Sequence, residues 1–151
     1  MTVYDFYVMS SIEKKRAAKE MPNDELQGLM VSWTNVINLS NQFKALYNEL
    51  HDFDKKAAGL IASIKRKFSA KTREESETKR KAILNKIAAA SRENGYADME
   101  AVWNYEIDAV LAKYPNVKSE DIAVRNYSLI TLSSNIKEAA VSILVKEAES
   151  R

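Results

Sequence analysis

The sequence predicts an all-α fold, an elongated helical bundle built on one long helix at about residues 24–69 with shorter helices folding back on it. Only three Gly and two Pro occur in 151 residues, whereas average usage is about 7% and 5%, so turns are few and the elements between them long. Apolar residues also recur at alternating steps of three and four, which is the period of an amphipathic helix. We expect residues 1–151 to form a single helical domain.

The first ten residues carry an aromatic and β-branched run, VYDFYVM. Such residues favour a strand, but no second strand is indicated that could pair with this one. We therefore expect residues 1–10 to form an irregular or extended arm whose Tyr4, Phe6 and Tyr7 pack on helices. The alternative is that these three aromatic side chains contact a partner.

Capping residues and an apolar stripe mark the first two helices. Ser10 and Glu13 have the spacing of a capping box, which predicts a helix over 11–20. A stripe at helical spacing then predicts the long helix over 24–69. Its main members are Leu26, Met30, Trp33, Ile37, Phe43, Tyr47, Leu50, Ala57, Ile61, Ile64 and Phe68.

A continuous helix over 24–69 would be about 70 Å long at 1.5 Å per residue. That length exceeds the reach of a compact domain of this size. Either the shorter helices cover the stripe serially, or part of it is left for a second chain. A protein partner is therefore expected, and the long helix could also join copies of this chain in a homo-oligomer.

The second half of the chain predicts three more helices. A capping box at 72–75 opens the first, which ends near Gly95, a residue suited to a left-handed C-cap. Asp98 caps the next helix, which ends at Pro115. The last helix is expected over 120–149, although its YSLITLSS run is β-prone.

Catalytic and cofactor-binding motifs are absent from the sequence. There is no Cys, and His51 is the single histidine, so neither a histidine pair nor a thiolate site can form. The three glycines are isolated and make no phosphate-binding loop. We expect a non-enzyme with no cofactor and no metal, in which His51 lies on the surface and Trp33 and Trp103 belong to the core.

The sequence gives no sign of a membrane segment. No apolar run approaches the roughly 18 residues of a membrane span, and the first residues lack the basic region of a signal peptide. The absence of Cys suits a reducing compartment. We expect a soluble, cytoplasmic protein.

Positive charge is concentrated at residues 65–81, KRKFSAKTREESETKRK. This stretch holds eight basic residues against three Glu, although the whole chain has a net charge of only +2. A helix dipole accounts for basic residues at the end of the long helix but not for those near the start of the next. The candidate contacts with nucleic acid or an acidic partner are Lys65, Arg66, Lys67, Lys71, Arg73, Lys79, Arg80 and Lys81.

These observations favour a non-catalytic helical interaction protein that binds another macromolecule, above all a protein, and modulates its activity as an inhibitor or adaptor. Small, cysteine-free helical chains with few motifs are typical of phage or mobile-element proteins that bind a host machine. The alternative is a nucleic-acid-binding regulator, in which the basic stretch contacts phosphates without reading sequence.

Overall fold

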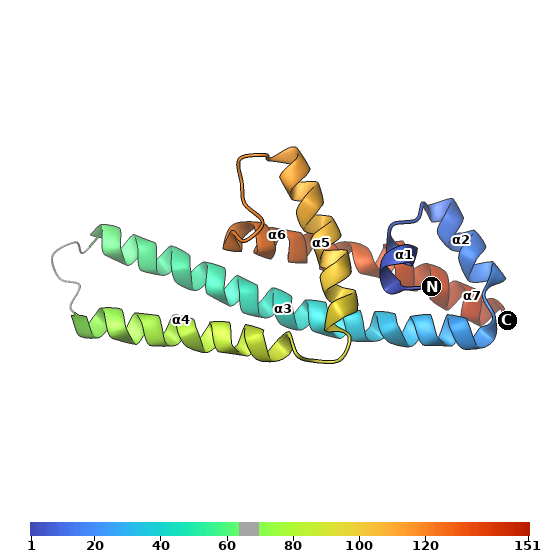
Figure 1. The fold of residues 1–151 in the computed structure, drawn as a ribbon, viewed down its shortest axis with the longest axis horizontal. Coiled ribbons are helices and arrows are strands. Elements are labelled where there is room, and N and C mark those ends of the chain that lie inside the picture. Colours follow the sequence, from blue (N-terminus) through green and yellow to red (C-terminus); the bar gives the residue numbers. More distant parts are fainter. Residues whose placement is uncertain (64–69) are drawn as a thin grey trace.

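The computed structural model describes residues 1–63 and 70–151, and every regular element in those residues is a helix (Figure 1). The predicted all-α class is therefore confirmed. The elements are α1 (Val3–Tyr7), α2 (Ser11–Glu20), α3 (Asn23–Ser63), α4 (Ala70–Ala90), α5 (Tyr96–Lys113), α6 (Ile122–Ile136), the π-helix η1 (Lys137–Val141) and α7 (Ser142–Ser150).

The predicted long helix is α3, which runs for 41 residues and is about 60 Å long at 1.5 Å per residue. Gly28 and Gly59 lie inside it without interrupting it. Ser40 falls in a gap of the apolar stripe, and its buried hydroxyl donates to the Ile37 carbonyl oxygen at 3.0 Å. The expected end of the helix, at 64–69, lies outside the described residues.

Shorter helices fold back on α3, as the sequence predicts. In Figure 1, α4 runs antiparallel along the second half of α3, whereas α6 lies beside the middle of α3, and η1 and α7 continue along its first half. Helix α5 crosses between them and packs on both α3 and α6, and α2 packs on α7. We call residues 51–63 and 70–82 the arm, and the rest of the described chain the head.

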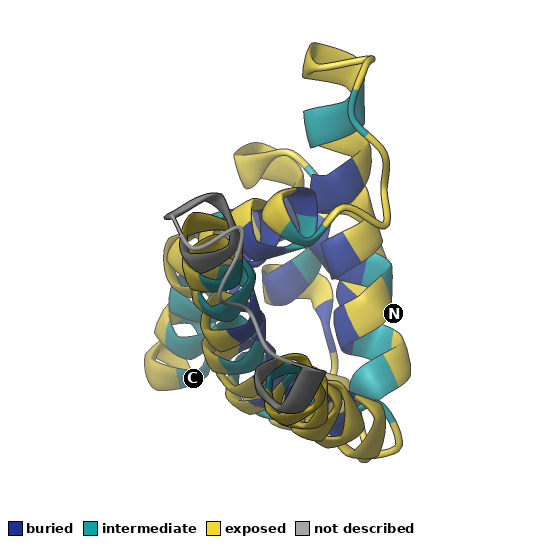
Figure 2. Ribbon diagram, turned by 90° about the vertical axis from the view of Figure 1, so that its left-hand side faces the viewer, coloured by how far each residue is buried: buried dark blue, intermediate teal, exposed yellow. Residues whose placement is uncertain are grey.

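The buried core ends where the arm begins. The α3 side chains at Leu26, Trp33, Phe43, Tyr47 and Leu50 are buried. Beyond Leu50, none of the residues at 51–59 and 73–82 is buried. Figure 2 looks along the arm from its far end, and the nearer turns of both helices are yellow and teal rather than dark blue. The head helices thus cover the apolar stripe of α3 one after another along its length, whereas in the arm α4 is the helix that packs along α3.

The irregular or extended conformation predicted for residues 1–10 is wrong, because residues 3–7 form helix α1, whereas the predicted packing of Phe6 and Tyr7 on helices is confirmed. The Thr2 hydroxyl accepts from the Asp5 N–H at 3.0 Å, and the Asp5 carboxylate accepts from the Thr2 N–H at 3.3 Å. This capping box fixes a helical turn whose Phe6 and Tyr7 side chains are buried. Strand propensity mainly reflects packing on a sheet, so it does not hold where local capping and tertiary burial favour a helix.

Two capping predictions have different outcomes. Ser10 caps α2, because its hydroxyl accepts from the Glu13 N–H at 3.2 Å. The box predicted at 72–75 does not open α4, since this helix already begins at Ala70. Residues 70–72 are helical, so Thr72 cannot serve as an N-cap, whose backbone angles are non-helical.

The last helices also differ from the sequence prediction in their bounds. Asp98 lies in the first turn of α5 rather than at its N-cap, which is Gly95. The β-prone run near residue 130 is helical throughout. A π-helix, which the sequence did not predict, joins α6 to α7.

Gly95 is the one described residue with positive φ, at 90°, and a Cβ there would lie 3.1 Å from the Asn35 Cβ. A non-glycine residue in the left-handed region costs about 1–2 kcal/mol, so we expect Gly95→Ala to destabilise the protein by at least that amount. Gly28→Ala is the matched control: nothing lies within 4 Å, so it should gain up to about 1 kcal/mol of helix propensity. Equal effects in urea unfolding would contradict this account.

Candidate interaction surfaces

The basic stretch is only partly within the described residues. Lys65, Arg66 and Lys67 lie outside them, and so does the side chain of Lys71. Of the remaining candidates, Arg73, Lys79 and Lys81 are exposed on α4, whereas Arg80 is half-buried. The triplet Lys79–Lys81 therefore does not act as one uniform patch.

Arg80 pairs with a carboxylate across the hairpin, although its side chain remains 41% exposed. Its Nε lies 2.9 Å from Asp54 Oδ1 and its Nη2 lies 3.3 Å from Oδ2, a two-point ion pair between α4 and α3. These hydrogen bonds raise the pKa of Arg80. Arg80 lies midway along α4, beyond the first turn in which the helix dipole acts, and its pairing with Asp54 gives it a structural role.

We expect Arg80→Ala to lower the free energy of unfolding by only about 0.5 kcal/mol, because both partners are partly exposed and such pairs contribute little. Asp54→Asn should have a similar effect. The double variant should be less destabilised than the sum of the two, which a double-mutant cycle in urea would measure. Strict additivity would show that the pair contributes nothing.

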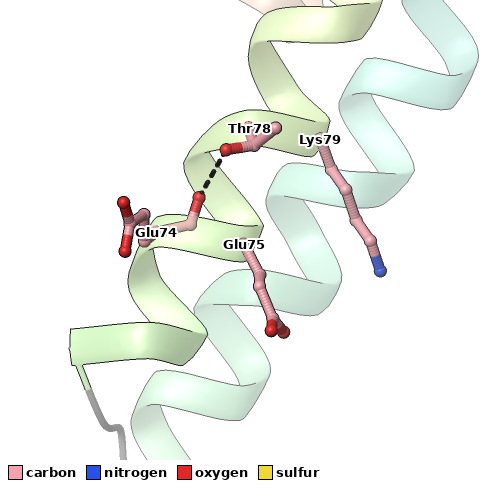
Figure 3. Close-up of a pocket in the computed structure, with 4 residues that line it drawn as sticks. All are labelled: Glu74, Glu75, Thr78 and Lys79. Atoms are coloured by element: carbon pink, nitrogen blue, oxygen red, sulfur yellow. Dashed lines mark hydrogen bonds between the residues drawn. The ribbon is translucent and has the colours of Figure 1, made fainter.

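Carboxylates accompany the remaining cations of the arm. A hollow of about 470 Å³ is lined by Glu74, Glu75, Thr78 and Lys79, which Figure 3 draws. The Thr78 hydroxyl donates to the Glu74 carbonyl oxygen at 2.8 Å. Glu75 and Lys79 project from the same side of α4, and Glu74 points away from them. The local field is mixed in sign, which weakens attraction for a polyphosphate backbone.

A second groove of about 410 Å³ lies between α3 and α4. Its apolar residues are Phe53, Ala82 and Ile83, of which Ile83 is buried and Phe53 half-buried. Charges of both signs surround them. The charged lining residues are Glu49, Asp52 and Lys56 from α3, and Lys79 and Lys86 from α4.

The aromatic residues predicted as N-terminal contacts divide between core and surface. Phe6 is fully buried and Tyr7 is 6% exposed, whereas Tyr4 is 41% exposed. The Tyr4 ring lies edge-on to Tyr105 of α5 at 6.4 Å between centroids. Only Tyr4 is therefore positioned as a surface contact, and it is joined by Tyr105, which is also exposed.

A pocket of about 410 Å³ opens beside these rings. It is lined by Tyr7 of α1, Tyr105 and Glu106 of α5, Asn135 of α6 and Glu138 of η1. The Tyr7 hydroxyl donates to Glu106 Oε1 at 2.6 Å. Burial, together with the Glu106 carboxylate, raises the pKa of Tyr7, so the phenol stays protonated and keeps donating.

Sequence reasoning missed Glu106, although a signal was present. Glu106 occupies a stripe position of α5, following Val102 and Trp103 and preceding Ile107 and Val110 at helical spacing. A carboxylate on an apolar stripe is unusual because burying an unpaired charge is costly. This break in the apolar stripe of α5 could have marked Glu106 as a candidate site residue.

The two tryptophans belong to the core as predicted, but their indole N–H groups differ. Trp103 Nε1 donates to the Ser128 hydroxyl at 2.9 Å. Trp33 Nε1 is buried without a hydrogen-bond partner in the described part of the chain. His51 is half-buried on α3 rather than fully on the surface.

Two further kinds of site were sought in the described residues: a cluster of metal-ligating side chains and a helix suited to crossing a bilayer. Over 1–63 and 70–151, no three His, Cys, Asp or Glu side chains gather closely enough to hold a metal ion. None of the helices in that part of the chain combines the length and apolar character that crossing a bilayer requires. No protein-family model, curated protein or solved structure matches the chain.

Proposed function

We propose that this chain is a non-catalytic helical interaction protein whose arm binds another protein and thereby modulates it. The observation that carries the proposal is the lack of buried residues at 51–59 and 73–82. Ordering a residue's backbone costs about 1–2 kcal/mol, and helices in proteins are stabilised mostly by tertiary packing. A hairpin that buries so little of its own surface is expected to bury more against a partner.

The groove between α3 and α4 favours a particular kind of partner. Its apolar floor of Phe53, Ala82 and Ile83 fits the apolar stripe of an amphipathic helix, a common mode of recognition. Lys79 and Lys86 line the α4 side of the groove, so acidic residues on one flank of that helix would fix its direction. An inhibitor or an adaptor could act through such a contact.

Nucleic acid is the alternative partner. The ion pair of Arg80 with Asp54 and the position of Glu75 beside Lys79 both lower the positive potential that phosphates would meet. These contacts support protein over nucleic acid as the partner of the arm.

Site-specific photo-crosslinking in cells of the native source tests the proposal. A photoreactive residue replaces Ala82 in the groove, and Lys118, exposed in the loop after α5, serves as the matched control position. We expect a protein captured from Ala82 and not from Lys118. The purified partner should then bind the Lys79→Glu/Lys86→Glu variant at least tenfold more weakly than the parent chain.

Four outcomes would overturn the proposal. Capture of nucleic acid alone from Ala82 would support the alternative, as would a salt-sensitive gel shift that the Lys79→Ala/Arg80→Ala/Lys81→Ala variant abolishes. Capture of a second copy of this chain would make the groove a homo-oligomer contact. Equal capture from both positions would mean that the arm has no special role.

A further inference from the structure

We propose that the pocket lined by Tyr7, Tyr105, Glu106, Asn135 and Glu138 binds a guanidinium group. This inference concerns the head and goes beyond the proposed function, because it holds whether or not the arm binds a protein.

Glu106 is the first reason. It is 9% exposed, and the neutral hydroxyl of Tyr7 is its hydrogen-bond partner, on Oε1. Within the described residues, Oε2 accepts no hydrogen bond and no cation lies within ion-pair distance of the carboxylate. The Glu106 oxygens are not among the buried side-chain atoms that lack a partner, so Oε2 is open to the pocket that this residue lines. The Glu106 carboxylate therefore has no cationic partner in the described residues, and a ligand could supply one.

The tyrosine rings are the second reason. Tyr7 and Tyr105 meet almost at right angles, at 89°, with centroids 5.8 Å apart, so they form a corner of aromatic surface beside the carboxylate. Cations bind the faces of aromatic rings, and the ring open to a ligand here is that of Tyr105, which is 43% exposed, because Tyr7 is buried and packs on Trp33. Lys14 Nζ already lies 5.7 Å from the Tyr7 centroid, although Lys14 is not among the residues lining the pocket.

The lining residues from α6 and η1 are the third reason. Glu138 lies in the π-helix η1, and Asn135 lies just before it at the end of α6. Single π-helical turns inside α-helices occur frequently at functional sites. Glu138 belongs to this π-helical turn, and its carboxylate is the second one in the lining of the pocket. Among the described residues, the lining thus carries the carboxylates of Glu106 and Glu138 and no cationic side chain.

The donor set favours a guanidinium over other cations. A bare metal ion would need more closely gathered ligands than the described residues provide. A guanidinium presents planar N–H donors that pair with carboxylates, and its face stacks on aromatic rings. Asn135 adds an amide oxygen as a further acceptor.

Titration with Nα-acetyl-arginine amide, followed by NMR, tests the site on the full chain. The control ligand is the uncharged isostere Nα-acetyl-citrulline amide. For a ligand of this size we expect a Kd on the order of 1 mM, with shifts centred on the five lining residues. Binding should fall at least tenfold in Glu138→Gln, an exposed position where folding should be kept, and in Glu106→Gln.

Asp108→Asn is the matched control, because Asp108 is an exposed carboxylate of α5 outside the pocket, and it should leave the Kd unchanged. Similar Kd values for ethylguanidine and for a short arginine peptide would assign the site to small guanidines. A peptide that binds tenfold tighter would assign it to an arginine side chain of a polypeptide. Equal binding of the citrulline compound, or unchanged binding in Glu138→Gln, would overturn the proposal.

Discussion

Replacing Trp103 by alanine should lower the free energy of unfolding by about 3–5 kcal/mol, the usual cost of removing a large buried aromatic side chain. Trp103 is 1% exposed, and its ring packs edge-on against Phe43 and Tyr47 at 5.8 and 5.4 Å between centroids. The Arg125 guanidinium carbon lies 5.0 Å from its centroid on the α6 side. One side chain thus joins α5 to both α3 and α6.

Phenylalanine at the two tryptophan positions provides a sharper comparison. Trp103→Phe removes the hydrogen bond to Ser128, whereas Trp33→Phe removes a buried N–H that has no partner in the described residues. Loss of the Trp103 hydrogen bond lowers stability, whereas loss of an unpaired buried donor removes an unfavourable group. Trp103→Phe should therefore lower the free energy of unfolding by about 1 kcal/mol more than Trp33→Phe does.

Urea unfolding followed by far-ultraviolet circular dichroism measures both variants, since the signal does not depend on the tryptophan that is removed. The variant Ser128→Ala isolates the hydrogen bond: it should destabilise the parent chain but have a smaller effect in the Trp103→Phe background. A larger loss in Trp33→Phe than in Trp103→Phe would show that the Ser128 contact contributes little.

Most of the fold could be predicted because helical periodicity is a local property of the sequence. The stripe from Leu26 to Leu50 and the cap at Ser10 depend on spacing alone, and both are confirmed. Helix α1 could not be predicted in the same way. Its aromatic residues favour a strand locally, and the burial of Phe6 and Tyr7 in the head is a tertiary contribution that spacing does not reveal.

The candidate sites were less predictable, because they depend on residues that are distant in sequence. The pairing of Arg80 with Asp54 joins two helices across 26 positions, so the triplet at 79–81 looked like an unexplained patch. Tyr7 and Glu106 are 99 positions apart. The sequence marks each residue as unusual but does not show that the two meet.

Neighbouring positions on α3 should respond very differently to truncation, because the core ends between them. Leu50 is 0% exposed, and Leu50→Ala should lower the free energy of unfolding by about 2–5 kcal/mol. Phe53 is half-buried in the groove of the arm, and Phe53→Ala should cost less than about 1 kcal/mol, although a larger side chain is removed. Urea unfolding of the two variants measures the difference.

Hydrogen exchange provides an independent measurement of the same boundary. Amides of α3 before Leu50 should exchange through global unfolding, whereas those of the arm should exchange through local opening at lower free energy. If Phe53→Ala were as destabilising as Leu50→Ala, and the arm amides were equally protected, the arm would already be part of the core. A partner-binding role for the surface of the arm would then have no physical basis. If the expected difference is found, Phe53→Ala becomes a variant that tests partner binding in a chain whose head remains folded.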